Sequence, residues 1–131
     1  MDLEKYSKPT LRIAISLVFL YFGYQQITSP DLWTSFIPSA ILALGISAKT
    51  LVITNSIVEL SLGTLLLLGL YTRVSSLVLS LHLFGIAFSI GFNPLGIRDF
   101  GLAFATLVIF LNGVDRLCLD KKRIISFINS R

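Results

Sequence analysis

The chain has 131 residues and one cysteine, with a formal net charge of +4; 54% of it is hydrophobic and only 14% is charged. A soluble domain carries roughly a quarter charged residues, and one of this size could not bury so much apolar surface in its own core. The composition therefore excludes an ordinary soluble domain, and the lone cysteine excludes an intramolecular disulfide. Since the positive charge gathers at the chain ends, it does not favour nucleic-acid binding. We expect an all-α membrane protein with a single membrane domain over residues 1–131.

Four apolar segments predict a four-helix transmembrane bundle. They run over about residues 9–27, 50–71, 74–92 and 98–114. Crossing the hydrocarbon takes about 20 apolar residues, with a range of about 17–25. The first three segments meet this length, and the fourth meets it only because residues 98–114 include flanks of the shorter apolar run at about 99–113. The turn at residues 71–73 is so short that the second and third helices should form an antiparallel hairpin.

A long link joins the first two spans and contains Pro30, Trp33 and Pro38. A tryptophan beside a proline at the end of a span suits the headgroup level of the bilayer. The stretch "IPSAILALGI" within this link is apolar but too short to cross the membrane. It predicts a short re-entrant or interfacial helix.

The lysines and arginines predict that both termini lie in the cytoplasm of a multi-pass protein of the cell membrane. In this orientation nine of them are cytoplasmic, and two, Lys49 and Arg98, lie on the other side. The basic tail, residues 115–131, is then cytoplasmic. It predicts either an amphipathic helix on anionic headgroups or a plain stop-transfer flank with a frayed end.

Glu59 stands near the middle of the second predicted span. A charged side chain at that depth is costly and normally faces the interior of a bundle or water. Two explanations remain open. The carboxyl either carries a proton or binds a ligand, or it is a neutral group hydrogen-bonded between helices that fixes their packing.

Other polar groups are expected at the depth of Glu59. With a rise of about 1.5 Å per residue, Tyr21 and Glu59 both lie roughly 18 Å above the inner boundary, and His82 roughly 12 Å above it. These three residues are the predicted catalytic group. The alternatives are a packing histidine and a core or interfacial tyrosine. The predicted ligand-binding positions around them are Asn55, Gly63, Thr106, Arg98 and Asp99.

Two of these positions, Arg98 and Asp99, mark the outer mouth of the fourth span. Asp99 is expected to cap that helix, where a negative group is favoured by the helix dipole. Arg98 is expected to bind an anion or a headgroup, or to serve only as an interface anchor. Arg12, about one turn into the first span, is expected to snorkel towards the inner headgroups.

Four stretches in order resemble the DoxX family of small four-helix membrane proteins: "LRIAISLVFLYFGYQQ", "LWTSFIP", "VELSLGTLLLLGLYTR" and "IRDFGLAFATL". Together they cover about residues 11–112. Where the family often has a lysine after the glycine of the first helix, this chain has Gln26. The positions to which the resemblance assigns importance are Arg12, Gly23, Glu59, Gly63, Arg73, Arg98 and Asp99.

Some members of that family are subunits of thiosulfate:quinone oxidoreductases, and others carry oxidoreductase names. The resemblance therefore implies a subunit of a quinone-linked membrane redox complex, with Glu59 binding the quinone or passing its proton. The sequence has no haem, flavin or metal motif, so electrons would come from a partner or a bound substrate. A non-catalytic scaffold or assembly factor is the main alternative. A small proton-coupled transporter is the other, although the long first loop does not favour it. The expected partners are the bilayer, other membrane or redox subunits and further copies of the chain.

Overall fold

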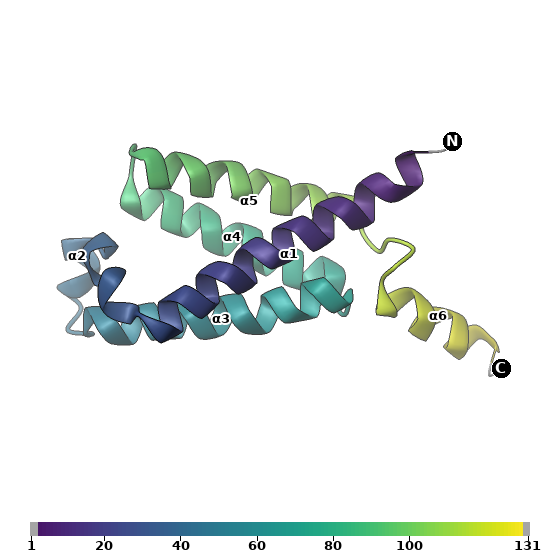
Figure 1. The fold of residues 1–131 in the computed structure, drawn as a ribbon, viewed down its shortest axis with the longest axis horizontal. Coiled ribbons are helices and arrows are strands. Elements are labelled where there is room, and N and C mark those ends of the chain that lie inside the picture. Colours follow the sequence, from purple (N-terminus) through teal and green to yellow (C-terminus); the bar gives the residue numbers. More distant parts are fainter. Residues whose placement is uncertain (1–2, 130–131) are drawn as a thin grey trace.

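The computed structural model describes residues 3–129, and these residues are helical without any β-strand. In chain order the elements are α1 (Glu4–Thr28), the 3-10 turns η1 (Pro30–Leu32) and η2 (Thr34–Phe36), α2 (Ser39–Leu42), α3 (Ala48–Leu68), α4 (Thr72–Ile90), α5 (Pro94–Asn112) and α6 (Leu119–Asn129). The helices α1, α3, α4 and α5 form the helical body, α1 crosses the others obliquely, and α6 leaves the body at the end where α1 begins (Figure 1). The last part of the predicted tail, residues 130–131, lies outside the described residues.

Three helices, α3, α4 and α5, are long and apolar enough to cross a membrane. Each lies over a predicted span, but with shifted ends. The helix α3 ends before Gly69, whose φ of 68° lies in the left-handed region. The helix α5 begins at Pro94 because the side chain of Asn93 accepts hydrogen bonds from the N–H groups of Leu95 and Gly96. The prediction that Asp99 caps this helix was therefore wrong, since Asp99 lies within it.

The helix α1 covers the first predicted span but is not one of these three helices. It has 25 residues, which gives a length of roughly 37 Å. Its hydropathy is lowered by polar residues such as Arg12 and Gln26, and both of these are buried against the other helices. Its outward face carries Leu17, Tyr21 and Tyr24, each more than half exposed.

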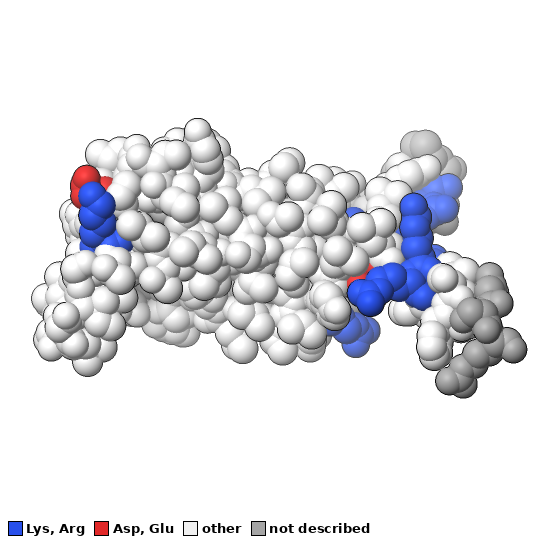
Figure 2. All heavy atoms as spheres, turned by 90° about the horizontal axis from the view of Figure 1, so that it is seen from below, with Lys and Arg blue, Asp and Glu red and all other residues white. Residues whose placement is uncertain are grey.

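The buried face of each long helix repeats every three or four residues, as in packed helical bundles. In α3 this face is formed by Val52, Ser56, Glu59, Gly63 and Leu66. Small and polar side chains are frequent on these buried faces, whereas large hydrophobic side chains are exposed along the body. This arrangement is typical of helices that pack together in lipid. Figure 2 shows the charged residues of one side near the two ends of the molecule, with a wide uncharged surface between them.

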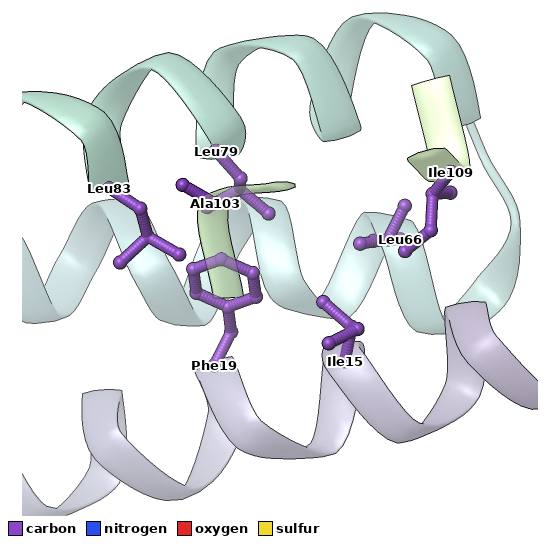
Figure 3. Close-up of a cluster of buried hydrophobic side chains, with 7 residues drawn as sticks. All are labelled: Ile15, Phe19, Leu66, Leu79, Leu83, Ala103 and Ile109. Carbon is purple, nitrogen blue, oxygen red and sulfur yellow. The ribbon is translucent and has the colours of Figure 1, made fainter. Parts of the chain in front are cut away.

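A hydrophobic core joins the four helices of the body (Figure 3). Its buried members are Ile15 and Phe19 of α1, Leu66 of α3, Leu79 and Leu83 of α4, and Ala103 and Ile109 of α5. Two pairs of helices pack closely, α1 with α3 and α4 with α5. Because every long helix contributes to the core, the core fixes how these two pairs lie against each other.

The first loop contains the short helix α2 within the stretch predicted to form a helix. This helix has a single turn, and its residues are largely exposed. The two 3-10 turns before it bring the loop back over the end of α1 and α3, with which η1 is in contact. The loop therefore covers one end of the helical body.

Arg12 is buried at the opposite end of the body, with an exposed fraction of 1%. Its Nε lies 2.6 Å from Oδ2 of Asp115, and its Nη1 donates to the carbonyl oxygens of Leu66 and Leu67. These carbonyls belong to the last turn of α3, where few helical N–H groups remain to bond them, and that of Leu66 also accepts from the N–H of Gly69. The prediction that Arg12 snorkels to the headgroups was therefore wrong, because a carboxylate and a helix end satisfy it inside the protein.

The segment after α5 packs against the turn between α3 and α4. Cys118 is fully buried beside Gly69, and the backbone N–H of Asp120 donates to the carbonyl of Gly69. The carboxylate of Asp120 accepts hydrogen bonds from the N–H groups of Tyr71 and Thr72 at 2.9 and 2.8 Å. Asp120 thus caps α4 from a distant part of the chain.

Two carboxylates of this C-terminal segment have lowered pKa values. Burial alone would raise the pKa of Asp115, but the hydrogen bonds from Arg12 and from the N–H of Leu117 outweigh it and lower the pKa below the usual 3.8. Burial also opposes the shift at Asp120, where the N–H groups at the start of α4 bring the pKa below the same value. Both groups are therefore more acidic in the folded chain than in the unfolded one.

Acid is accordingly expected to destabilise the protein. A carboxylate whose pKa is lower in the folded state adds stability that is present above its unfolded pKa and is lost as the pH falls through the folded value. The free energy of unfolding should therefore fall below about pH 4. Thermal unfolding in detergent from about pH 6 to about pH 3 measures this loss, which should be smaller for Asp120→Asn. Asp31 is exposed, so Asp31→Asn should lose as much stability in acid as wild type does. If Asp120→Asn also loses as much as wild type, the cap does not contribute to the acid sensitivity.

Candidate functional site

A cavity of about 520 Å³ lies in the helical body near the end covered by the first loop. Residues of α1, α3, α4 and α5 line it, together with loop residues from Trp33 to Ile41. Most of the lining is apolar, and a few polar side chains converge on it. Cavities of this size and character bind small amphipathic molecules.

Glu59 lies in the wall of this cavity with an exposed fraction of only 4%. Its Oε2 accepts a hydrogen bond of 3.1 Å from Nε2 of Gln26, and its Oε1 accepts one of 3.1 Å from Nδ2 of Asn55. The same Asn55 nitrogen donates to Oε1 of Gln26 at 2.6 Å. The carboxyl is thus held by two amides from α1 and α3 at the edge of an apolar space.

His82 of α4 extends this network. Its Nε2 lies 2.6 Å from Oδ1 of Asn55. Since the amide oxygen of Asn55 can only accept, the hydrogen must be on Nε2 of His82, and Asn55 links the imidazole to the carboxyl of Glu59. Three of the predicted site residues, Glu59, Asn55 and His82, therefore form one hydrogen-bonded chain across α3 and α4.

Arg98 and Asp99 form a second polar group on the cavity wall. Nη2 of Arg98 lies 2.7 Å from Oδ1 of Asp99, whose side chain is buried. The guanidinium also lies over the ring of Phe22 of α1, 4.4 Å from its centroid. Because a carboxylate and a ring face hold it, the guanidinium of Arg98 lies at the cavity and does not extend away from the protein.

Aromatic rings form the wall near the loop. Phe22 packs edge-to-face on Trp33 with ring centroids 5.8 Å apart, and Trp33 contacts Phe36 at 6.0 Å. Trp33 lines the cavity and is the only tryptophan of the chain. Its ring packs over the cavity, at the end of the helical body that the first loop covers.

Three of the predicted site residues lie outside the cavity. Tyr21 is 58% exposed on the outer face of α1, and its hydroxyl accepts a hydrogen bond from Gln25. Gly63 packs against the Cβ of Phe19 and the side chain of Leu20 in α1, so its lack of a side chain lets the two helices approach closely. Thr106 is buried, and its hydroxyl donates to the carbonyl of Leu102 in its own helix. The structure therefore does not bring Tyr21, Gly63 and Thr106 to the wall of the cavity that Glu59 lines.

The sequence reasoning missed Gln26, which contacts both Glu59 and Asn55. Depth alone selected Tyr21, but depth does not say which face of a helix a residue occupies. Steps of three and four residues from Arg12 lead along the buried face of α1 through Phe19 to Gln26. Tyr21, two residues after Phe19, lies roughly 200° further round the helix. Helical phase was the signal that could have found Gln26.

In the comparison with known families, the DoxX family model matches residues 8–91 of the chain. The matched part extends from α1 to the end of α4, and so contains Glu59, Gln26, Asn55 and His82. No curated protein and no solved structure gives a match.

Proposed function

Because the chain belongs to the DoxX family of membrane proteins, we propose that it is a subunit of a quinone-linked membrane redox complex. In this proposal the cavity binds the headgroup of a quinone, and Glu59 exchanges a proton with it. The observation that carries the proposal is a buried carboxyl, hydrogen-bonded to Gln26 and Asn55, at the wall of an apolar, aromatic-lined cavity of about 520 Å³.

The proposal includes a membrane arrangement in which α1 is a fourth span beside α3, α4 and α5. The support is the length of α1, the apolar side chains on its outward face and its packing along α3. Both ends of the chain would then lie on the cytoplasmic side. Basic residues such as Arg73, Arg116 and Lys122 belong to that end, whereas Lys49 and Arg98 belong to the other.

The chemistry of the cavity favours a quinone over a purely apolar ligand. A quinone ring is flat and apolar on its faces, which suits the rings of Phe22 and Trp33. Its two carbonyl oxygens need hydrogen-bond donors, and Arg98 and Gln26 each carry more than one N–H group on the lining. A ligand without polar atoms would use none of these donors.

Proton transfer is the contribution of the chain itself. Reduction of a quinone to a quinol takes two electrons and two protons. The electrons come from a partner redox subunit, which is oxidised in the same step. One of the two protons reaches a quinone oxygen from the carboxyl of Glu59, which is then reprotonated from water, and the second proton comes from water. The link through Asn55 keeps that carboxyl in contact with the imidazole of His82.

The fluorescence of Trp33 offers a direct test, because a quinone bound in the cavity should quench this single tryptophan. Titration of the purified protein with decylubiquinone should quench the fluorescence and raise the unfolding temperature. Glu59→Gln should weaken binding about ten- to a hundredfold, because an amide nitrogen would then face the donor of Gln26 or Asn55.

The matched control is Glu4→Gln, since Glu4 is the only other glutamate in the sequence. It should bind the quinone as wild type does. Wild-type protein that shows neither quenching nor thermal protection with benzoquinones or naphthoquinones would contradict the proposal. That result would favour the non-catalytic scaffold, for which Glu59 fixes only the packing of helices.

A further inference from the structure

One face of α4 both lines the cavity and reaches the protein surface. Leu81, Gly85 and Ser89 follow one another at intervals of four residues, so they lie in a row along the helix. All three line the cavity and all three are exposed. The cavity is therefore open along this row.

A matching row lies on α3. Leu51, Thr54 and Val58 line the cavity, and Thr54 is exposed. Their spacing of three and four residues places them on one face of that helix. The opening is thus a slot between two helices, with one row of side chains on each side.

The path of the chain explains why α3 and α4 leave a slot. They are joined by a tight turn after Gly69, and from this turn they diverge towards the end covered by the first loop (Figure 1). Each packs more extensively against another helix, α3 against α1 and α4 against α5, than the two pack against each other. The slot lies in the half of the seam that is distant from the turn.

We propose that this slot is a lateral portal through which a lipid-dissolved quinone passes between the bilayer and the cavity. The proposal rests on the proposed function, since it concerns the same cavity and the same ligand. Both helices that form the slot are long and apolar enough to cross a membrane. An opening along their shared seam therefore faces acyl chains and not water.

The residues around the slot suit the passage of a ligand with an apolar tail. Gly85 has no heavy atom within 4 Å of the position where a Cβ would stand, so it leaves open space at the mouth. The end of the cavity towards the water is covered instead by the loop residues Ile37, Pro38 and Ile41. A quinone with a long tail partitions into the bilayer, and the slot lets the tail remain among the lipids while the ring reaches Glu59.

The test narrows the slot without changing the polar groups of the cavity. In Gly85→Phe a ring would stand at the mouth, and in the matched control Gly101→Phe the same ring would stand on α5. Gly101 is also an exposed helical glycine with no heavy atom near a Cβ, but it does not line the cavity. Neither substitution adds a tryptophan, so Trp33 remains the single fluorescent reporter.

The measurement is the rate at which Trp33 fluorescence is quenched when phosphatidylcholine vesicles containing the protein are mixed with vesicles containing decylubiquinone. Gly85→Phe should slow quenching about tenfold, and Gly101→Phe should stay within about twofold of wild type. Equal rates for the two variants would overturn the portal while leaving the proposed function intact. Absence of quenching in wild-type protein would instead overturn the proposed function.

A second pair of variants covers the case in which Gly85→Phe does not fold. Ser89→Phe should slow quenching in the same way, because Ser89 lies one turn further along the slot. Its control is Ser61→Phe, at an exposed serine of α3 that does not line the cavity. Quenching by Ser89→Phe as fast as by this control would also overturn the portal.

Discussion

Replacement of Asp115 by asparagine is expected to lower the free energy of unfolding by about 3–5 kcal/mol. The variant keeps the shape of the side chain but leaves the guanidinium of Arg12 without its counter-charge. Both side chains are buried, with exposed fractions of 2% for Arg12 and 3% for Asp115, so water cannot replace the lost partner. Most of the expected effect is the cost of a buried charge that has become unpaired.

The chain contains a natural control in the ion pair between Lys49 and Asp31. Its N–O distance is 3.4 Å, but its side chains are 55% and 79% exposed. Exposed pairs contribute about 0–1 kcal/mol, so Asp31→Asn should change little. Equilibrium unfolding of both variants in mixed micelles with increasing denaturing detergent compares them directly. Equal losses for Asp115→Asn and Asp31→Asn would show that the buried pair is not important for stability.

A double variant separates the pair from the packing around it. Arg12→Met with Asp115→Leu removes both charges and keeps apolar side chains of similar volume. Replacement of a buried ion pair by apolar residues is often neutral or stabilising. The double variant should therefore recover much of the stability that Asp115→Asn loses. If the double variant is as unstable as Asp115→Asn, the loss comes from the hydrogen bonds that Arg12 donates to the carbonyls of Leu66 and Leu67.

The second large effect is expected at Gly69, where replacement by alanine should lower the free energy of unfolding by about 2–5 kcal/mol. A backbone contribution and a steric contribution add to give this loss. The φ of 68° lies in the left-handed region, which costs an alanine about 1–2 kcal/mol. A Cβ at this position would stand only 2.5 Å from the Cα of Cys118, and overpacking of that kind costs about 1–3 kcal/mol.

Gly45 isolates the first of these terms. Its φ of 82° lies in the same region, but no heavy atom lies within 4 Å of the position of its Cβ. Gly45→Ala should therefore cost only the backbone term of about 1–2 kcal/mol. The difference between the two variants in the same unfolding assay measures the contact between the C-terminal segment and the turn after α3. If the two variants lose equal stability, Cys118 moves away at no cost.

The positions of the three apolar helices follow directly from the sequence, because each is a long run of hydrophobic residues. Their ends could not be predicted from hydropathy, since side-chain and backbone geometry sets them. Asn93 starts α5 before its charged Arg98 and Asp99, and Gly69 ends α3 before the apolar Leu70. Hydropathy gives the location of a helix, whereas local hydrogen bonds decide where it begins and ends.

The polar contacts were harder to predict because they join distant parts of the chain. Glu59 was predicted as a site residue because a charged side chain in an apolar segment has a high free-energy cost, and it does line the cavity. The sequence predicts that Arg12 is an end-of-helix anchor, because nothing near it indicates a partner 103 residues later. Asp120 likewise could not be recognised as the cap of α4, since a cap is normally adjacent in sequence.

The distance in sequence between Arg12 and Asp115 has a consequence for biosynthesis. A ribosome adds about 5–20 residues per second, so the carboxylate is made roughly 5–20 s after the guanidinium. In the proposed arrangement, where α1 is a fourth span, its guanidinium has no counter-charge during that interval, which the hydrocarbon disfavours. The helix α1 would therefore settle fully into the membrane only after the three other spans have been made.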